Sequence, residues 1–342
     1  NGDFKGIFSR VEVDSRITPA KIEDVIGQTG LETLLTDHLS KLSGYNHERR
    51  RNVHALPLCT FVFGVPGCGK TFNVHAHFQS FAQLYREKGV PGWFRVLSIT
   101  DFGSKYQNET PLKLQQFATE CEEFQGPVAI YVPDADVILQ SRSDAHITQE
   151  QKQTMGIMFQ FFDGTLIRKT GKTLIYADAN YTDGIDDATK SRIFDEVFVM
   201  ERWNKPEYFA QLARQTLEKD IILPVSEEEW AKVGEYLLEC PGADEPLSNR
   251  EIGHALRKIT RNYTVPMTMV GAPYEEHEKH KAQHIEGINY EKIITTINEY
   301  ITTRQRMDQM SLDRKAKDEY RQFMKDLGTK HVSGTNEATD AT

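Results

Sequence analysis

Residues 58–71 read Leu-Cys-Thr-Phe-Val-Phe-Gly-Val-Pro-Gly-Cys-Gly-Lys-Thr, an apolar run that leads into the spacing Gly-x-x-x-x-Gly-Lys-Thr. The apolar run predicts a buried strand, and the pattern from Thr71 onward predicts a helix. Glycines at the turn between them let backbone N–H groups point inward onto an anion, where the positive end of the helix dipole adds to the attraction. The stretch therefore predicts a phosphate-binding loop, or P-loop.

The chemistry expected of this loop follows from its last two residues. Lys70 is expected to reach the β- and γ-phosphates of ATP, and the hydroxyl of Thr71 is expected to bind Mg²⁺. A glycine-rich turn with an accidental Lys-Thr pair is the competing interpretation, and the strand and helix on either side favour the P-loop. ATP and Mg²⁺ are therefore the expected cofactors. The expected ATP-binding residues of this stretch are Gly64, Val65, Pro66, Gly67, Cys68, Gly69, Lys70, Thr71 and Phe72.

Short β-rich runs alternate with longer helical patterns in the first 200 residues. The expected strands are 58–63, 94–99, 128–132, 173–177 and 197–200. The expected helices between them are 71–88, 111–124 and 149–162, with a short turn at 186–191. This alternation predicts an α/β fold, a doubly wound parallel sheet whose ligand lies at the carboxyl ends of the strands.

After Pro206 the strand pattern stops and helical patterns take over, at 207–219, 227–239, 249–260, 290–303 and 306–327. A small α-helical lid domain is therefore expected to follow the sheet domain. The last residues are polar, which is typical of a disordered tail. The expected organisation is an N-terminal segment at 1–20, a P-loop ATPase domain at 21–203, a small helical domain at 204–305, and a C-terminal helix and tail at 306–342.

Composition and charge exclude several classes of protein. The chain has 342 residues, of which 39% are apolar, enough for two domains, and its net charge of −9 disfavours a surface that wraps nucleic acid or lies on anionic lipid. Its four cysteines lack Cys-x-x-Cys spacing, which is typical of a reducing compartment, and a cytoplasmic location is expected. An apolar run of about 18 residues and a charged leader are both missing, so neither a membrane span nor a signal peptide is expected.

A P-loop needs a second strand that ends in acidic residues, for the metal ion and for the attacking water. The candidate is Val128-Ala-Ile-Tyr-Val-Pro-Asp-Ala-Asp136, in which four or more apolar residues lead into carboxylates. The first position after the strand is Pro133, which carries no charge. Asp134 would then have to serve the water, the metal ion, or both. An inert nucleotide-binding module is the alternative interpretation.

Two further segments lie on either side of the P-loop in the sequence. Asp24-Val-Ile-Gly27 precedes it, and Ser104-Lys-Tyr-Gln-Asn-Glu109 follows the second expected strand. Together with the P-loop they resemble the AAA subgroup of the AAA+ ATPases, in which the first segment lies on the adenine side of the nucleotide and the second is a pore loop. The residues that this resemblance implies are Ile26 and Gly27 for ATP binding, and Lys105, Tyr106 and Gln107 for the pore loop.

The same resemblance implies residues for hydrolysis. Pro133-Asp-Ala-Asp136 stands where the family writes Asp-Glu-x-Asp, and Gln160-Phe-Phe-Asp-Gly164 resembles the Gln-Met-Asp-Gly that follows. The implied metal ligands are Thr71 and Asp134. The implied catalytic residues are Asp134, the polar sensor Asn180, the arginine finger Arg192, and the second sensor Arg250 in the helical domain.

The resemblance also implies how such a protein would work. An arginine finger enters a neighbour's site, so a homo-oligomeric ring is expected, by analogy a hexamer, with Arg192 acting in trans. Tyr106 would then face a central pore and act on a threaded or remodelled protein substrate, as in an unfolding chaperone. A fainter similarity to plant-type Rubisco activase, which is active without an aspartate at the position of Pro133, supports hydrolysis. The alternatives are a slow or inactive nucleotide-gated scaffold and a ring motor on nucleic acid, which the acidic balance disfavours.

Overall fold

The chain forms two compact units. The first unit is Asn1–Asn204 with Ser248–Arg250, and the second is Lys205–Leu247 with Glu251–Thr342. A computed structural model of the protein describes residues 10–98, 109–139, 149–180, 185, 187–218, 222–243 and 246–333.

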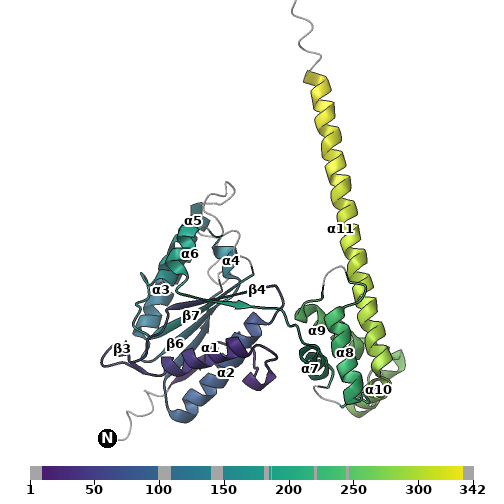
Figure 1. The fold of residues 1–342 in the computed structure, drawn as a ribbon, viewed down its shortest axis with the longest axis horizontal. Coiled ribbons are helices and arrows are strands. Elements are labelled where there is room, and N and C mark those ends of the chain that lie inside the picture. The colour runs from purple at the N-terminus through teal and green to yellow at the C-terminus, as the bar shows by residue number, and fades with distance from the viewer. Residues whose placement is uncertain are drawn as a thin grey trace, which may run out of the picture. The chain divides into compact units, whose positions relative to one another are not determined.

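A six-stranded sheet forms the centre of the first unit (Figure 1). The strand order is β1-β5-β6-β7-β4-β8, and every neighbouring pair is parallel. This confirms the predicted α/β fold with a parallel sheet. The strands are β1 (Val11–Val13), β4 (Cys59–Gly64), β5 (Gly92–Val96), β6 (Val128–Val132), β7 (Thr173–Ala179) and β8 (Glu196–Met200); β2 (Tyr45–Asn46) and β3 (Arg51–Asn52) form a separate antiparallel pair.

Burial along the strands follows their place in the sheet. Every residue of β6 and of β7 is buried, as expected for central parallel strands with helices on both faces. Side chains of β8, an edge strand, alternate instead, and Val197 and Val199 are exposed. The central position of β7, between β6 and the P-loop strand β4, places its carboxyl end next to the expected phosphate site.

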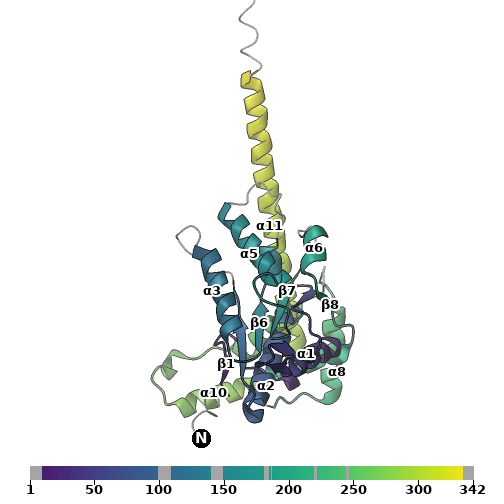
Figure 2. The same cartoon turned by 90° about the vertical axis from the view of Figure 1, so that its left-hand side faces the viewer.

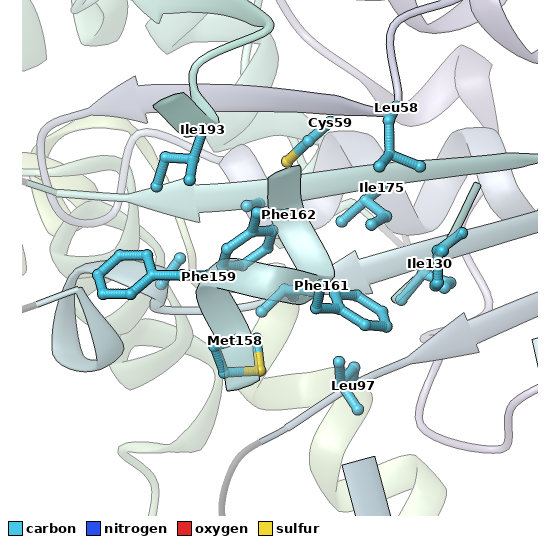
Figure 3. Close-up of a cluster of buried hydrophobic side chains, with 14 of the residues drawn as sticks. Leu58, Cys59, Leu97, Ile130, Met158, Phe159, Phe161, Phe162, Ile175 and Ile193 are labelled. Carbon is cyan, nitrogen blue, oxygen red and sulfur yellow. The ribbon is translucent and has the colours of Figure 1, made fainter. Parts of the chain in front are cut away.

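Helices cover both faces of the sheet (Figure 1, Figure 2). One hydrophobic cluster joins α1 and α2 to the sheet, and the other joins α3 and α5 to the opposite face. Figure 3 shows Phe161 and Phe162 of α5 lying over Ile130 and Ile175 of the sheet. The helices of this unit are α1 (Thr29–Leu42), α2 (Lys70–Lys88), α3 (Glu109–Glu123), α4 (Ala135–Ile138), α5 (Gln149–Asp163) and α6 (Asp187–Ile193), with the 3₁₀ turn η1 (Ile22–Asp24).

Asp14 fastens the segment that follows β1 to the neighbouring strand β5. Its backbone N–H donates to Phe94 O at 2.9 Å, and its side chain accepts from Val96 N at 3.2 Å and from Arg16 Nε at 2.9 Å. Burial alone would raise the pKa of Asp14, but the hydrogen bonds from Arg16 and Val96 outweigh burial and lower the pKa from 3.8 to about 2. The charged carboxylate therefore stabilises the fold.

We expect Asp14→Asn to lower the free energy of unfolding by about 1–2 kcal/mol at neutral pH, after allowance for solvent screening. Because the folded-state pKa lies below the ordinary value, this contribution is present above about pH 4 and is lost as the pH falls towards 2. Urea denaturation of both proteins between pH 7 and pH 3 measures the difference. Asp37→Asn, an exposed change on α1, is the control. A deficit that is the same across this pH range would contradict the assignment.

The second unit is helical. Gly234 lets α8 approach α7 closely, because a Cβ atom at this position would lie 2.3 Å from Pro206 O. The N-terminus of α8 is a capping box, in which Ser226 Oγ accepts from Glu229 N at 3.3 Å and Glu229 Oε2 accepts from Ser226 N at 2.8 Å. The helices are α7 (Pro206–Leu217), α8 (Glu227–Glu239), α9 (Asn249–Arg261), α10 (Tyr274–Glu286) and α11 (Tyr290–Ser333), with the 3₁₀ turn η3 (Met267–Met269).

The C-terminal helix differs from the sequence prediction. The structure has one continuous helix, α11, where two helices at 290–303 and 306–327 were expected. The residues at the expected break are Arg304 and Gln305, which favour helix, and neither glycine nor proline interrupts the chain there. Across the described ranges, the helices lack the combination of length and apolar character that crossing a membrane requires.

Candidate nucleotide-binding site

The predicted P-loop connects the end of β4 to the start of α2. Gly67 and Gly69 have φ values of 76° and 104°, a region that glycine adopts readily and other residues rarely do. At Gly64 a Cβ atom would lie 2.9 Å from Met200 O, so the loop passes too close to β8 for a side chain. Cys68 Sγ also lies 3.5 Å from Met200 Sδ. The loop is therefore packed tightly against the end of β8.

The ammonium group of Lys70 is held inside the loop. Lys70 is buried, and its Nζ donates to Gly64 O at 2.7 Å and to Val65 O at 3.3 Å. It also donates to Asn180 Oδ1 at 2.9 Å. The structure thus brings together the lysine expected to contact phosphate and the asparagine expected to act as the sensor.

Three polar side chains meet beside the start of α2. Thr71 Oγ1 lies 3.3 Å from Asp178 Oδ2 and 2.8 Å from the hydroxyl of Tyr131, which is also within hydrogen-bond distance of Asp178 Oδ2. Tyr131 has one hydroxyl proton, so it donates to the carboxylate while the Thr71 hydroxyl supplies the second proton of the cluster. The result is a compact polar cluster at the end of β7.

Burial dominates the ionisation of this cluster. It raises the pKa of Asp178, although hydrogen bonds from Tyr131 and Asp134 and the charge of Lys70 act in the opposite direction. Burial, together with the charge of Asp178, also raises the pKa of Tyr131, which therefore remains a hydroxyl donor at neutral pH. A cation placed next to Asp178 would favour its charged form.

The acidic turn after β6 lies against the same cluster. Asp134 is exposed, has a φ of 50°, and donates its backbone N–H to Asp178 Oδ1 at 2.6 Å. Asp136 Oδ2 accepts from Asn180 N at 2.9 Å, and its other oxygen is buried without a hydrogen-bond partner among the described residues. Asp136 therefore positions Asn180, while the side chain of Asp134 is accessible to a ligand.

The expected adenine-side segment runs past the end of β8. Ile26 is buried, and Gly27 has a φ of 65°. Gln28 Nε2 donates to Glu201 O at 3.4 Å, directly after β8. Because β8 pairs with β4, this hydrogen bond places the segment at the carboxyl edge of the sheet, from which the P-loop emerges.

The remaining predicted residues make no hydrogen bond to this polar cluster among the described residues, although a Cβ atom at Gly67 of the P-loop would lie only 3.2 Å from Arg250 Cβ. Arg192, on α6, binds Asp163 at the end of α5, with its Nε 2.7 Å and its Nη2 2.5 Å from Asp163 Oδ2. Arg250 is an exposed residue in the first turn of α9, within the short stretch that groups with the first unit. The predicted pore-loop residues Lys105, Tyr106 and Gln107 lie outside the described residues.

Two residues of the cluster have no role in the sequence prediction, Tyr131 and Asp178. Both are polar groups inside strands that are otherwise apolar, and such a group is informative because burying it is costly without a partner. Asp178 also lies two residues before Asn180, which the sequence singles out. A polar residue within an apolar strand is a signal that could have identified Tyr131 and Asp178 from the sequence. Their contact with Thr71 could be seen only in the fold.

The fold and the loop together define a nucleotide-binding protein of the P-loop class. Residues 60–201 match the family model described as "ATPase family associated with various cellular activities (AAA)". This part of the chain is therefore an AAA domain, which confirms the resemblance seen in the sequence.

Two solved structures have a similar fold. A chain of the HORMA:CdnC:Trip13 complex from E. coli MS115-1 is 16% identical, with a TM-score of 0.58 over 81% of this chain and 89% of that one. The FIGL-1 AAA domain, in a crystal structure with ADP, is 14% identical, with a TM-score of 0.57 over 84% and 85% of the two chains. A search of curated proteins gave no match.

The residues present fit a magnesium-bound nucleotide. Gly67 and Gly69 have the positive φ values that a tight phosphate-binding turn requires, and the ammonium of Lys70 is held inside the loop. Hydroxyl and carboxylate oxygens, from Thr71 and Asp178, are the ligands that Mg²⁺ prefers. In its AAA domain the chain thus has donors for phosphate and oxygen ligands for a hard cation.

Proposed function

We propose that this protein is an ATPase that assembles into a homo-oligomeric ring and uses ATP hydrolysis to remodel a protein substrate. The observation that carries the proposal is the hydrogen bond of 2.9 Å from Lys70 Nζ to Asn180 Oδ1 within an AAA domain. It joins the lysine expected to bind phosphate to the expected sensor. The two similar structures support it: one comes from a complex with a HORMA protein, and the other binds ADP.

Each residue of the site has a defined task in this proposal. Lys70 neutralises the β- and γ-phosphates, and Asn180, held by Asp136, orients the attacking water near Lys70. Asp134 accepts a proton from that water, since its carboxylate is exposed at the turn after β6. Magnesium, when bound, draws charge from the phosphate oxygens.

Arg192 would act on the site of the next subunit. Its side chain is 57% exposed, and Asp163 holds the guanidinium on the surface of α6. A half-exposed arginine with a fixed orientation suits insertion into a neighbouring site, where it would stabilise the transferring phosphoryl group. Hydrolysis would therefore depend on assembly, and the rate per subunit would rise with protein concentration. A rate per subunit that stays constant on dilution below the assembly range would contradict this role.

Replacing Tyr106 with alanine tests the remodelling step. We expect ATP turnover within about twofold of wild type, because a pore-loop tyrosine would contact the client and not the nucleotide, and we expect loss of ATP-dependent work on a client protein. The client is first captured with the Asp134→Asn variant in ATP, and its unfolding is followed by hydrogen exchange. Tyr274→Ala, which removes a 72% exposed tyrosine of α10, is the control. Equal loss of turnover and of client unfolding would count against the proposal.

A nucleotide-gated scaffold is the second candidate, and Pro133 favours it. A proline directly after β6 supplies no carboxylate for metal or water. A scaffold of this kind would bind ATP, assemble, and release phosphate slowly or not at all. Steady-state phosphate release from the wild-type ring separates the two functions.

A further inference from the structure

The register of β6 and β7 places the carboxylate of Asp178 beside Pro133, the position after β6 where an acidic residue is missing. P-loop ATPases hold Mg²⁺ between the P-loop Ser or Thr and an aspartate that follows a neighbouring strand. Here the residue after β6 is Pro133. Val132 pairs with Ala177 in parallel register, so the next level of the sheet has Pro133 on one side and Asp178 on the other.

The position of β7 brings this carboxylate closer to the P-loop. Strand β7 lies between β6 and β4, and Asp178 pairs with Val62, two residues before Gly64. Asp178 Oδ2 consequently lies 3.3 Å from the hydroxyl oxygen of Thr71. A carboxylate displaced by one strand can therefore serve the same metal position.

The hydrogen-bond partners of Asp178 are all neutral, and the positive charge of Lys70 acts on it only from beyond ion-pair distance. It accepts from the hydroxyls of Tyr131 and Thr71 and from the backbone N–H of Asp134, and it forms no ion pair with any described residue at contact distance. Asp178 is only 3% exposed, and a buried carboxylate is costly when its charge is not balanced. A divalent cation bound next to Thr71 would supply that balance.

We propose that Asp178 is the metal-side carboxylate of this site, binding Mg²⁺ together with Thr71, and that Tyr131 positions it. This inference rests on the proposed nucleotide site. It assigns separate tasks to the two acidic residues: Asp178 binds the metal, and Asp134 is left for the water. Pro133 is then no obstacle to hydrolysis, because the carboxylate that it lacks comes from β7.

Nucleotide binding with and without magnesium tests the assignment. The affinity of a fluorescent ATP analogue is measured by anisotropy in Mg²⁺ and in EDTA, for wild type, Asp178→Asn, and the exposed control Asp37→Asn. We expect magnesium to strengthen binding to wild type and to the control. In Asp178→Asn the ratio of the two affinities should fall by about 10–100-fold, with the affinity in EDTA unchanged.

A double variant separates metal binding from a structural role. Pro133→Asp combined with Asp178→Asn returns a carboxylate to the same level on β6, and it should restore the magnesium dependence. A ratio in Asp178→Asn equal to that of wild type would overturn the inference, as would failure of the folded double variant to restore it. Absence of binding by wild type in both buffers would instead overturn the proposed nucleotide site.

A second substitution covers the case in which Asp178→Asn does not fold. Asp178→Cys replaces the carboxylate with a small thiol, which prefers Cd²⁺ to Mg²⁺. We expect Mg²⁺ to strengthen nucleotide binding by Asp178→Cys only weakly, and Cd²⁺ to restore it. Wild type measured in the same two ions is the reference. Support by Mg²⁺ at the wild-type level would overturn the assignment.

Discussion

Lys70→Ala is expected to reduce ATP affinity by at least about 100-fold, which corresponds to about 3 kcal/mol. The substitution removes the ammonium group that the loop holds with Gly64 O at 2.7 Å and Asn180 Oδ1 at 2.9 Å. Charge-assisted hydrogen bonds to phosphate are roughly twice as strong as neutral ones, and two phosphates lose their contact at once. ATP turnover should then be undetectable, because little nucleotide is bound at accessible concentrations.

Isothermal titration calorimetry measures this loss directly. Lys88→Ala is the matched control, since it removes an exposed lysine from the opposite end of the same helix, α2. The thermal transition of each variant checks its fold, because the acceptors left by Lys70 can cost about 1–3 kcal/mol of stability. Binding by Lys70→Ala within a few-fold of wild type would show that the P-loop is not the nucleotide site.

Asp134→Asn is expected to lower the turnover number by about 10²–10³-fold while ATP affinity stays within about threefold of wild type. The amide has the size of the carboxylate but cannot accept a proton from water. Because Asp134 is exposed and its backbone N–H, rather than its side chain, contacts Asp178, the fold should be retained.

Phosphate release and ATP affinity are measured on the same preparation of Asp134→Asn, to show whether turnover falls while binding is retained. Asp37→Asn again removes an exposed carboxylate of α1 and should leave both quantities unchanged. If wild type itself releases no phosphate but binds ATP, the scaffold function is favoured. If Asp134→Asn turns over at the wild-type rate, another group activates the water.

The fold could be predicted where local pattern and burial agree. β6 was predicted to the residue, because a strand buried on both faces is a continuous apolar run that ends at a proline and an aspartate. β1 has only three residues, too few for a periodic pattern. The helix α1 was missed although Leu31, Leu35 and Leu39 follow one another at helical spacing, so the sequence did contain that information.

The site could be predicted only as far as it is contiguous in sequence. The P-loop is a single stretch, so its residues could be named without a fold. The contact between Thr71 and Asp178 joins residues 107 positions apart, and it depends on β7 lying between β6 and β4. Sheet order of this kind follows from the packing of the whole domain, which no local pattern contains.

Met200 joins the nucleotide site to the connection between the two units. It touches the P-loop at Gly64 and Cys68, and only residues 201–204 separate it from Lys205, where the second unit begins. Close-packed atoms transmit displacement because they have no free space to absorb it. A displacement of the P-loop would therefore be transmitted to Met200 by direct contact, and so to the start of the connection.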